Sequence, residues 1–482
     1  MAASNDLASM DATAQAQLVA SGEASPKELV DAACERLERL NPKLNAVIHP
    51  ALDRARELAA SNELPEGPFR GVPFLMKDIG GNQKGQPYHA GMRCLKDANF
   101  TATEDSYFTQ KINAAGLITL GRTATSELAV LPTGETHAFG PVHNPWNLDH
   151  TTGGSSGGTG AAVAAGIVPM AHGSDGGGSI RIPAGHCGIV GLKPSRGRCS
   201  FGPGAGERWS GLSAEFALTR SVRDSARLLD AVAGPVPGDP YSAPLPTRSF
   251  AEQAAANPGS LRIGVMRDTP REIDMHPECV RAVDETAKRL ESLGHRVELA
   301  HPPALEESDL VAHYVKIVAT NVAQAVHSWG EVLGQEIGPG GVEPLTWSLA
   351  QQGKAMSAQE LLASIEYIHG FGRRLSSWWE GGFDLLLTPT TAQPPPTLGT
   401  LVSTEEEPLK AYFLAAPSGV FTLPHNLSGQ PGISLPLHVS DDGLPIGSQL
   451  VAQVGDEGML LSCATQLEEA APWIDRVPPL FG

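Results

Sequence analysis

Short apolar runs that alternate with helical patterns along the chain predict an α/β fold. Runs typical of buried strands occur at 46–48, 72–76, 117–120, 261–265, 295–299, 383–387, 433–437 and 448–451. Helical patterns extend over 278–293, 309–332, 358–379 and 456–469. The first helix begins after Ser25, which forms a capping box with Glu28, and the pair Asn41-Pro42 is expected to end it.

The chain has no visible division into separate blocks. At about 150 residues per domain, 482 residues would give about three domains. The alternation of strands and helices nevertheless runs without an internal repeat or a disordered linker, which fits one layered α/β/α structure better. We therefore expect a single domain over residues 1–482, in which a helical insertion at about 300–380 acts as a lid.

Charge excludes two classes of partner. The chain carries 35 Lys and Arg against 53 Asp and Glu, so its net charge of −18 would repel nucleic acid and anionic membrane surfaces. The longest uncharged apolar run, 161–171, is about half as long as a membrane span requires. Asp6 and Asp11 stand where a secretory signal would carry positive charge. We expect a soluble, cytoplasmic protein that binds neither nucleic acid nor membrane.

The six cysteines lie far apart and include no CxxC pair. This spacing favours ordinary reduced thiols over a disulfide framework or a zinc site. The sequence therefore indicates no metal.

Glycine and proline stand out in the composition, at 53 and 39 residues without any low-complexity segment. Glycines concentrate in two serine-bearing loops, 153–158 and 176–179. Between them, the apolar run 167–171 leads into His172-Gly173-Ser174-Asp175 and predicts a strand. A tight turn explains either loop alone, but two such loops beside one strand indicate chemistry.

The loops do not fit phosphate binding. No lysine follows either cluster as in a P-loop, and the GxGxxG spacing of a dinucleotide fingerprint is missing. Acyl transfer fits better, because three glycines before Ser179 allow several backbone N–H groups to face one point. Such an arrangement forms an oxyanion hole.

A serine nucleophile needs a base, and Lys77 is the best candidate. Lys77 directly follows the apolar strand 72–76, where burial would lower its pKa from about 10.4 and let it act near neutral pH. No nucleophile-elbow or histidine-triad pattern accompanies the nearby histidines, which are interpreted as structural or surface residues. These histidines are His137, His143, His150, His172 and His186.

The chain resembles the amidase signature family, whose members use a Ser–cisSer–Lys triad. The motifs are GVPFLMKD at 71–78, GRTATSE at 121–127, FGPVHNPW at 139–146, GGSSGGTGAAVAAG at 153–166, GSDGGGSIRIPAGHCGIVGLKPSRGR at 173–198, FDLLLTPT at 383–390 and NLSGQPGISLP at 426–436. The resemblance covers essentially the whole chain, with a core signature region at about 70–200. It implies the amidase signature fold, a large mixed twisted β-sheet covered by helices on both faces.

The resemblance also implies roles for individual residues. Ser179 would be the nucleophile, Ser155 the bridging serine in a cis peptide with Gly154, and Lys77 the terminal base. The triad would cleave a C–N bond through an acyl-enzyme, without a metal or an organic cofactor. The expected oxyanion donors are the amides of Gly176, Gly177, Gly178 and Ser179.

Further residues would support or line the site. Asp175 and Arg181 are expected to hold the nucleophile loop by a charged hydrogen bond, and Ser156 is a further supporting residue. The loop 202–211, with Arg208 and Trp209, is expected to gate the cleft. The segment expected to face the substrate is Ala129, Val130 and Leu131. Gly176 departs from the family, many of whose members have threonine there.

Within the family, the segments at 11–25, 41–48 and 257–265 resemble nylon oligomer hydrolases and urethane-cleaving amidases (urethanases). This resemblance implies hydrophobic, aryl or oligomeric amides and carbamates as small-molecule substrates. Two alternatives stay open: a glutamine amidotransferase A-type subunit that releases ammonia, and a non-catalytic scaffold that keeps the fold. A homodimer is a further expectation.

Overall fold

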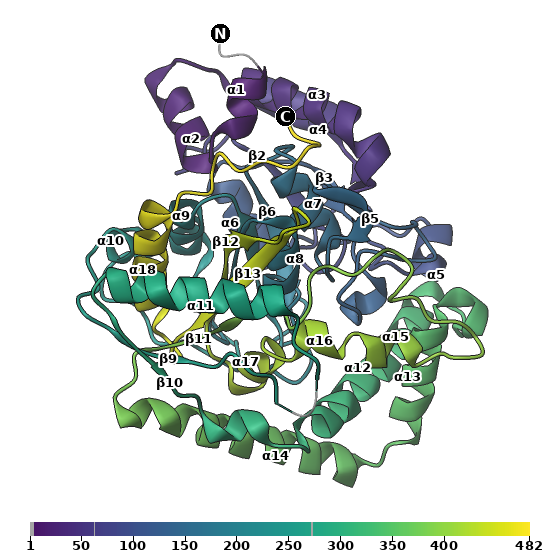
Figure 1. Cartoon of the computed structure of the whole chain (residues 1–482). Helices are drawn as coiled ribbons and strands as arrows, with labels where there is room; N and C mark the ends of the chain where they lie inside the picture. Colours follow the sequence, from purple (N-terminus) through teal and green to yellow (C-terminus); the bar gives the residue numbers. More distant parts are fainter. Residues whose placement is uncertain (1–3, 62, 271–272) are drawn as a thin grey trace.

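The computed structural model describes residues 4–61, 63–270 and 273–482, and its strands form a large central sheet with a smaller sheet beside it (Figure 1). The strands are β1 Val47–Pro50, β2 Pro73–Lys77, β3 Ile118–Thr123, β4 His143–Asn144, β5 Asn147–Thr151, β6 Met170–Asp175, β7 Val190–Lys193, β8 Ala214–Thr219, β9 Arg262–Val265, β10 Arg296–Leu299, β11 Leu385–Pro389, β12 Gly432–Val439 and β13 Pro445–Val451.

Helices surround both sheets. The α-helices are α1 Ser4–Ser9, α2 Ala12–Ser21, α3 Pro26–Leu44, α4 Leu52–Ala60, α5 Arg93–Asp97, α6 Tyr107–Ala114, α7 Gly157–Ala164, α8 Arg181–Cys187, α9 Val222–Val232, α10 Phe250–Ala254, α11 Pro277–Ser292, α12 Leu310–Leu333, α13 Pro344–Ala355, α14 Ala358–Ser376, α15 Lys410–Leu414, α16 Ala416–Gly419, α17 Leu423–Ser428 and α18 Glu457–Ala470. Short 3₁₀ segments are η1 Glu127–Ala129, η2 Pro303–Glu306, η3 Pro339–Gly341 and η4 Ser377–Gly381.

The large sheet is mixed. Its strand order is β10-β9-β11-β13-β12-β7-β8-β6, in which β9 runs parallel to β10 and β11 whereas the remaining neighbours are antiparallel. Strands such as β8, β11 and β13 are buried throughout, as expected where helices cover both faces of a sheet. The predicted fold class, a large mixed sheet between helices, is therefore confirmed.

The strand that carries Lys77 belongs to the smaller sheet. In the order β1-β3-β2, β2 is parallel to β3, and β1 pairs with β3 in the antiparallel sense. All residues of β2 are buried, and β2 packs closely against β6 of the large sheet. The junction of the two sheets thus brings the end of β2 beside the end of β6.

Three expected element boundaries are wrong. Helix α3 continues past Pro42 to Leu44, because a proline in the last turn loses only one helical hydrogen bond while Leu44 is fully buried. Strand β6 begins at Met170 rather than at 167, since Gly166, with φ +72°, and Pro169 place the preceding residues in a turn. The helix expected to reach Trp379 changes to a 3₁₀ turn after Ser376.

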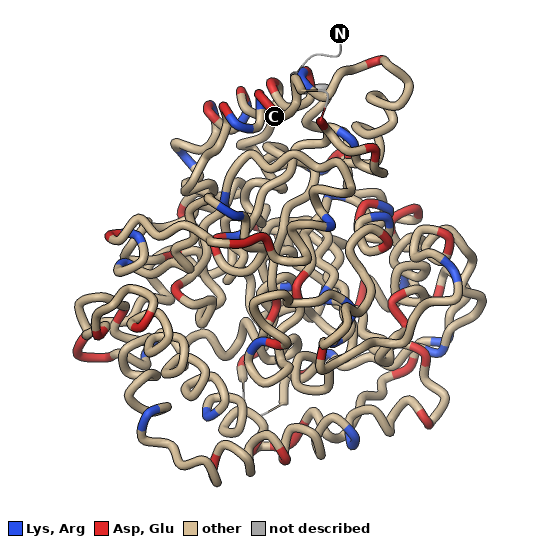
Figure 2. The backbone as a smooth tube through the Cα atoms, turned by 180° about the vertical axis from the view of Figure 1, so that it is seen from behind, with Lys and Arg blue, Asp and Glu red and all other residues tan. Residues whose placement is uncertain are grey.

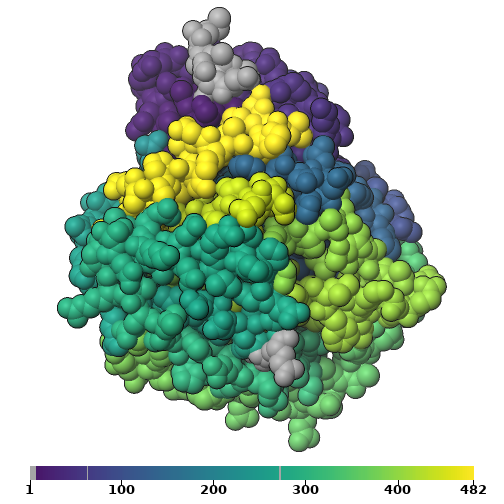
Figure 3. Space-filling model, viewed as in Figure 1, coloured from purple at the N-terminus to yellow at the C-terminus, as the bar shows by residue number. Residues whose placement is uncertain are grey.

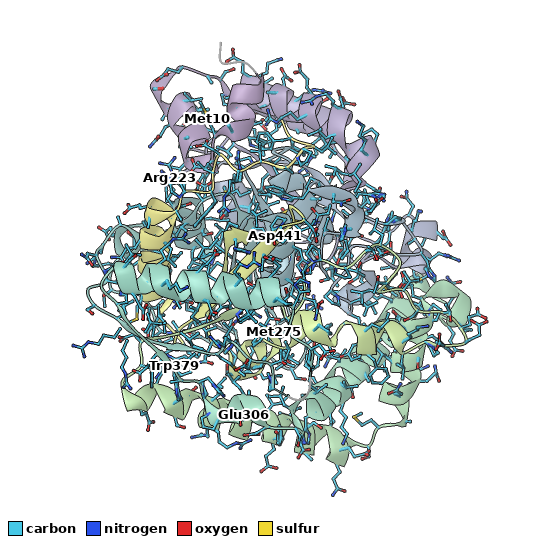
Figure 4. All side chains as sticks on the ribbon, in the orientation of Figure 1. Met10, Arg223, Met275, Glu306, Trp379 and Asp441 are labelled. Carbon is cyan, nitrogen blue, oxygen red and sulfur yellow. The ribbon has the colours of Figure 1, made fainter. Side chains whose placement is uncertain are left out.

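The C-terminal residues lie beside the N-terminal helices on one side of the molecule (Figure 3). The C-terminal Gly482 donates its N–H to the Ala165 carbonyl at 3.1 Å. Arg223 of α9 lies near Met10 (Figure 4) and forms an ion pair with Asp11 at 2.5 Å. The first bond attaches the C-terminus beside α7, and the ion pair attaches the start of α2 to α9.

Charges are dispersed over the molecule. Figure 2 shows lysine and arginine spread along the chain between aspartate and glutamate, which agrees with the absence of a basic run in the sequence. Among the residues that the structure describes, no helix is both long and apolar enough to cross a membrane. The six cysteines are unpaired.

Candidate active site

Lys77 lies at the end of β2 with its side chain fully buried. The parallel register with β3 places it opposite Thr123. Burial lowers the pKa of the Lys77 ammonium from 10.5 to about 7, although the carboxylates of Asp175 and Glu215 favour its charged form. A large share of the Lys77 side chains is therefore neutral at pH 7 and can accept a proton.

Two serine hydroxyls face the Lys77 amine. The Nζ atom lies 2.7 Å from Ser155 Oγ and 3.0 Å from Ser174 Oγ. Ser155 is buried, and the peptide bond between Gly154 and Ser155 is cis. Ser174, which the sequence analysis did not select, comes from β6. The amine thus has one hydroxyl from the loop 153–158 and one from β6 within hydrogen-bond distance.

Ser179 lies between β6 and α8, after three successive glycines. Its side chain is partly exposed and lines the same cavity as Ser155. The Ser156 N–H donates to the Ser179 carbonyl at 3.3 Å, and the Ser156 hydroxyl donates to the Ser174 carbonyl at 3.4 Å. These bonds join the two serine-bearing loops, which therefore form one site.

The backbone amides before Ser179 do not all face the cavity. Gly178 has a φ of +136°, a conformation that favours glycine, and its N–H donates to the Asp175 carboxylate at 2.7 Å. The expectation that Gly178 is an oxyanion donor is therefore wrong. Within the described part of the chain, the N–H groups of Gly176, Gly177 and Ser179 have no protein acceptor.

The nucleophile loop is anchored by a buried ion pair between Asp175 and Arg181. The guanidinium of Arg181 donates to the Asp175 carboxylate through Nε at 3.0 Å and Nη2 at 2.9 Å. Burial favours the neutral acid, but the Arg181 charge and hydrogen bonds outweigh it and hold the pKa of Asp175 well below its usual range. The remaining Arg181 donors reach Thr422, Gln449 and Asn426.

Arg181→Met should lower the free energy of unfolding by about 3–5 kcal/mol, because it leaves the Asp175 carboxylate buried without a counter-charge. Urea unfolding followed by circular dichroism measures the change. Arg267→Met is the matched control: Arg267 and Asp284 form an exposed pair at 3.3 Å, so the loss should stay below about 1 kcal/mol. Equal losses in the two variants would show that the Asp175–Arg181 pair does not anchor the loop.

A second buried pair, His172 and Glu215, lies behind Lys77. The Lys77 N–H donates to His172 Nδ1 at 3.2 Å, so the ring proton is on Nε2, which bonds Glu215 Oε1 at 2.9 Å. The same carboxylate oxygen accepts from the Gly81 N–H at 2.7 Å. The pair thereby holds the end of β2, which carries Lys77, and the turn that follows it. The sequence signal for His172 was its two-residue spacing from Ser174, which places both on one face of β6.

The other histidines near the loops do not reach the reacting groups. His186 is fully buried, and burial lowers its pKa to about 4. His143 and His150 bond backbone carbonyls through Nδ1, and His137 is exposed. Their interpretation as structural or surface residues fits these positions. His172 is structural too, but it contacts the Lys77 backbone directly.

The serines open onto a cavity of about 600 Å³. Its lining comes from residues 79–106, 128–129, 155, 174–179, 201–215 and 321–332. Helix α12 of the expected insertion forms one wall, and the loop expected to gate the cleft forms another. Movement of either element stays a prediction. Among the described lining residues, Arg208 has the one cationic side chain, against Glu104, Glu207 and Glu215.

The strip expected to face the substrate is shifted by one residue. Leu128 and Ala129 line the cavity, both with positive φ. Leu131 instead packs into a hydrophobic cluster, and its carbonyl accepts from the Ser126 hydroxyl at 2.8 Å. Neither Val130 nor Leu131 is among the described lining residues. The turn at η1 directs the chain away from the cavity after Ala129.

A family model described as Amidase matches residues 28–461, most of the chain. The chain belongs to the amidase signature family. It is 41% identical over 479 residues to the 6-aminohexanoate-cyclic-dimer hydrolase of Pseudomonas sp. (strain NK87), covering 98% of this chain and 97% of the relative. This amidase is therefore a hydrolase of C–N amide bonds.

Solved structures agree with this assignment. A 6-aminohexanoate cyclic dimer hydrolase complexed with substrate superposes with a TM-score of 0.95 at 40% identity, covering 98% of this chain and 100% of the other. A bacterial aryl acylamidase superposes with a TM-score of 0.87 at 28% identity, covering 96% of each chain. The amidase fold thus extends over nearly the whole molecule.

Proposed function

We propose that this amidase hydrolyses neutral amides with apolar flanking groups, including cyclic and aryl amides, through an acyl-enzyme on Ser179. The observation that carries the proposal is the buried Lys77 amine, 2.7 Å from Ser155 Oγ, behind a cavity into which Ser179 opens. A neutral lysine in this position is shielded from water and can act as the general base for the adjacent serine hydroxyl.

The proposed reaction begins with proton transfer. The Lys77 lone pair takes the Ser155 proton while one Nζ–H donates to Ser174, and Ser155 Oγ takes the Ser179 proton. Ser179 Oγ then attacks the carbonyl carbon, and the N–H groups of Gly176, Gly177 and Ser179 are the available donors for the oxyanion. As the C–N bond breaks, Ser155 gives one proton to the leaving nitrogen and regains one from Lys77. Water attacks the acyl-enzyme and releases the acid.

The substrate class follows from the character of the cavity. Aromatic side chains line part of it, where the rings of Tyr88 and Phe100 lie 5.8 and 5.1 Å from that of Trp329, centre to centre. Such a surface favours hydrocarbon and aryl groups. The names of the relatives, a cyclic-dimer hydrolase and an aryl acylamidase, support the same class. Carbamates carry a similar carbonyl–nitrogen bond and are proposed as further substrates.

The lining of the cavity is unfavourable for the carboxylate of a free amino acid. Glutamine carries a carboxylate, and the acidic lining with the exposed Arg208 gives that group no buried cationic partner among the described residues. We therefore rank the glutamine amidotransferase reading below hydrolysis of apolar amides. Homodimer formation and a cytoplasmic location stay predictions from the sequence.

A substrate panel tests the proposal: the cyclic dimer of 6-aminohexanoate, 4-nitroacetanilide, ethyl N-phenylcarbamate and glutamine. We expect kcat/KM for the cyclic dimer or the anilide to exceed that for glutamine by at least about 100-fold, since an uncompensated buried charge weakens binding strongly. Product amine and ammonia are measured in parallel. Glutamine as the best substrate, with ammonia released, would assign the amidotransferase activity instead.

A further inference from the structure

Trp209 adopts a backbone conformation that bulky residues rarely show. Its φ is +53°, and the next residue, Ser210, has a φ of +54°. A large side chain in the left-handed region is a true outlier. Such outliers persist where the surrounding structure enforces them, and they cluster at ligand-binding sites. The conformation of Trp209 therefore calls for a functional explanation.

Hydrogen bonds on both sides of Trp209 enforce this conformation. The Leu212 N–H donates to the Trp209 carbonyl at 3.2 Å, and the Ser213 N–H donates to the Arg208 carbonyl at 3.3 Å. Arg196 Nε donates to the Gly211 carbonyl at 2.5 Å and anchors the end of the turn. Trp209 is thus presented by a fixed turn.

The indole of Trp209 lies against Gly176, next to the nucleophile loop. A Cβ atom at Gly176 would lie 2.9 Å from Trp209 Cε3, a distance that real Cβ atoms essentially never show, and 3.1 and 3.2 Å from Trp209 Cζ3 and Ser213 Oγ, which are tight contacts. The ring therefore occupies the space that a side chain at 176 would fill. Tyr314 of α12 packs edge-to-face against the indole, with the ring centroids 6.5 Å apart, and its hydroxyl donates to the Gly176 carbonyl at 3.5 Å.

Trp209, Gly176 and Ser179 all line the same cavity. In the proposed reaction the Gly176 N–H, which has no acceptor within the described part of the chain, donates to the oxyanion, and this places the carbonyl attacked by Ser179 next to Gly176. Any group attached to that carbonyl on the side of Gly176 meets the face or edge of the indole. This surface is large and apolar, and Tyr314 packs against it, so it can select a substrate group by shape.

We propose that Trp209 is a specificity-determining residue of this amidase: its indole, seated on Gly176, forms the apolar wall that binds a hydrocarbon or aryl group next to the scissile carbonyl. The inference rests on the proposed function of Ser179. It adds that discrimination among neutral amides depends on the pairing of a tryptophan at 209 with a glycine at 176.

The first test measures discrimination within two substrate series. The first series varies the acyl group and compares the 4-nitroanilide of hexanoic acid with that of acetic acid. The second series varies the amine and compares the 4-nitroanilide of hexanoic acid with its N-methylamide. In Trp209→Ala, the ratio of kcat/KM for the larger to the smaller group should fall by about 10- to 100-fold in at least one series. The ratio for Trp209→Phe, which keeps an aromatic ring, should lie between the ratios for the wild type and Trp209→Ala. Unchanged ratios in both series would overturn the proposal.

The second test is a double-mutant cycle. Gly176→Ala should lower kcat/KM for the larger substrates, because the new Cβ displaces the indole. Adding Trp209→Ala removes the collision, so Gly176→Ala/Trp209→Ala should be at least about 10-fold more active than the product of the two single effects implies. Strictly additive effects would show that the ring does not act through its contact with Gly176.

Controls separate this inference from the proposed function. A wild type that hydrolyses none of the anilides and takes up no phenylmethylsulfonyl fluoride on Ser179 would refute the proposed function. A wild type that does both, with discrimination unaltered in Trp209→Ala, would refute only the role of Trp209. Circular dichroism verifies folding, and Trp209→Leu replaces Trp209→Ala if the alanine variant does not fold.

Discussion

Ser179→Ala should abolish amide hydrolysis, lowering kcat by at least about 10³-fold, because the site loses the only oxygen proposed to form the acyl-enzyme. Phenylmethylsulfonyl fluoride should add its sulfonyl mass to Ser179 in the wild type and add none in the variant. Mass spectrometry of the intact protein and of its peptides measures both results.

Ser292→Ala is the matched control for this experiment. Ser292 ends α11 on the surface, where its hydroxyl donates to the Arg289 carbonyl, so the control should be labelled on Ser179 and be active like the wild type. An adduct on Ser155, together with activity in Ser179→Ala, would move the nucleophile to Ser155. A folded wild type that takes up no label would instead favour the scaffold interpretation.

The sequence could point to the proposed reacting groups because each lies where a regular element begins or ends; local patterns indicated Lys77 and Ser179, and the family resemblance added Ser155. Lys77 is the last residue of an uninterrupted buried strand, and Ser155 and Ser179 precede α7 and α8. Apolar runs followed by glycine mark such ends clearly. The pairing of Asp175 with Arg181 was accessible for the same reason, since six residues and one turn separate them.

The residues that the sequence did not reveal act through tertiary register. Glu215 lies opposite Ser174 on the neighbouring strand β8, which nothing in the local sequence indicates. The assignment of Gly178 failed in a similar way. A run of glycines shows that amides can turn toward one point, but only the fold shows that the Gly178 amide turns to Asp175.

The substrate pocket was equally inaccessible to sequence reasoning. Its walls come from the β2–α5 connection, the loop before β8 and helix α12, which lie up to about 250 residues apart and meet only in the folded chain. The contact of Trp209 with Gly176 illustrates this limit. A glycine at 176 is visible in the sequence, whereas the ring that fills its place belongs to another loop.

The rate of acylation should rise with pH through the pKa of Lys77, which burial lowers to about 7. Below that pH the lysine is protonated and cannot accept the Ser155 proton, and above it kcat/KM should level off. Glu215→Gln removes a carboxylate that favours the charged lysine, so the acidic limb should move to lower pH. A profile of kcat/KM from pH 5 to 10 measures both, and an acidic limb that does not move in Glu215→Gln would contradict the assignment of the limb to Lys77.

Lys77→Met should lower kcat at pH 7 by about 10²- to 10⁴-fold, the usual contribution of a general base. It should also change how stability depends on pH. Between pH 7 and 10.5 the unfolded chain protonates this lysine and the folded chain does not, so wild-type stability should rise with pH by up to about 1.4 kcal/mol per unit. Urea unfolding at pH 7 and 9 should show this rise in the wild type and a smaller one in Lys77→Met. Equal slopes in the two proteins would mean that Lys77 keeps its ordinary pKa and is no base at neutral pH.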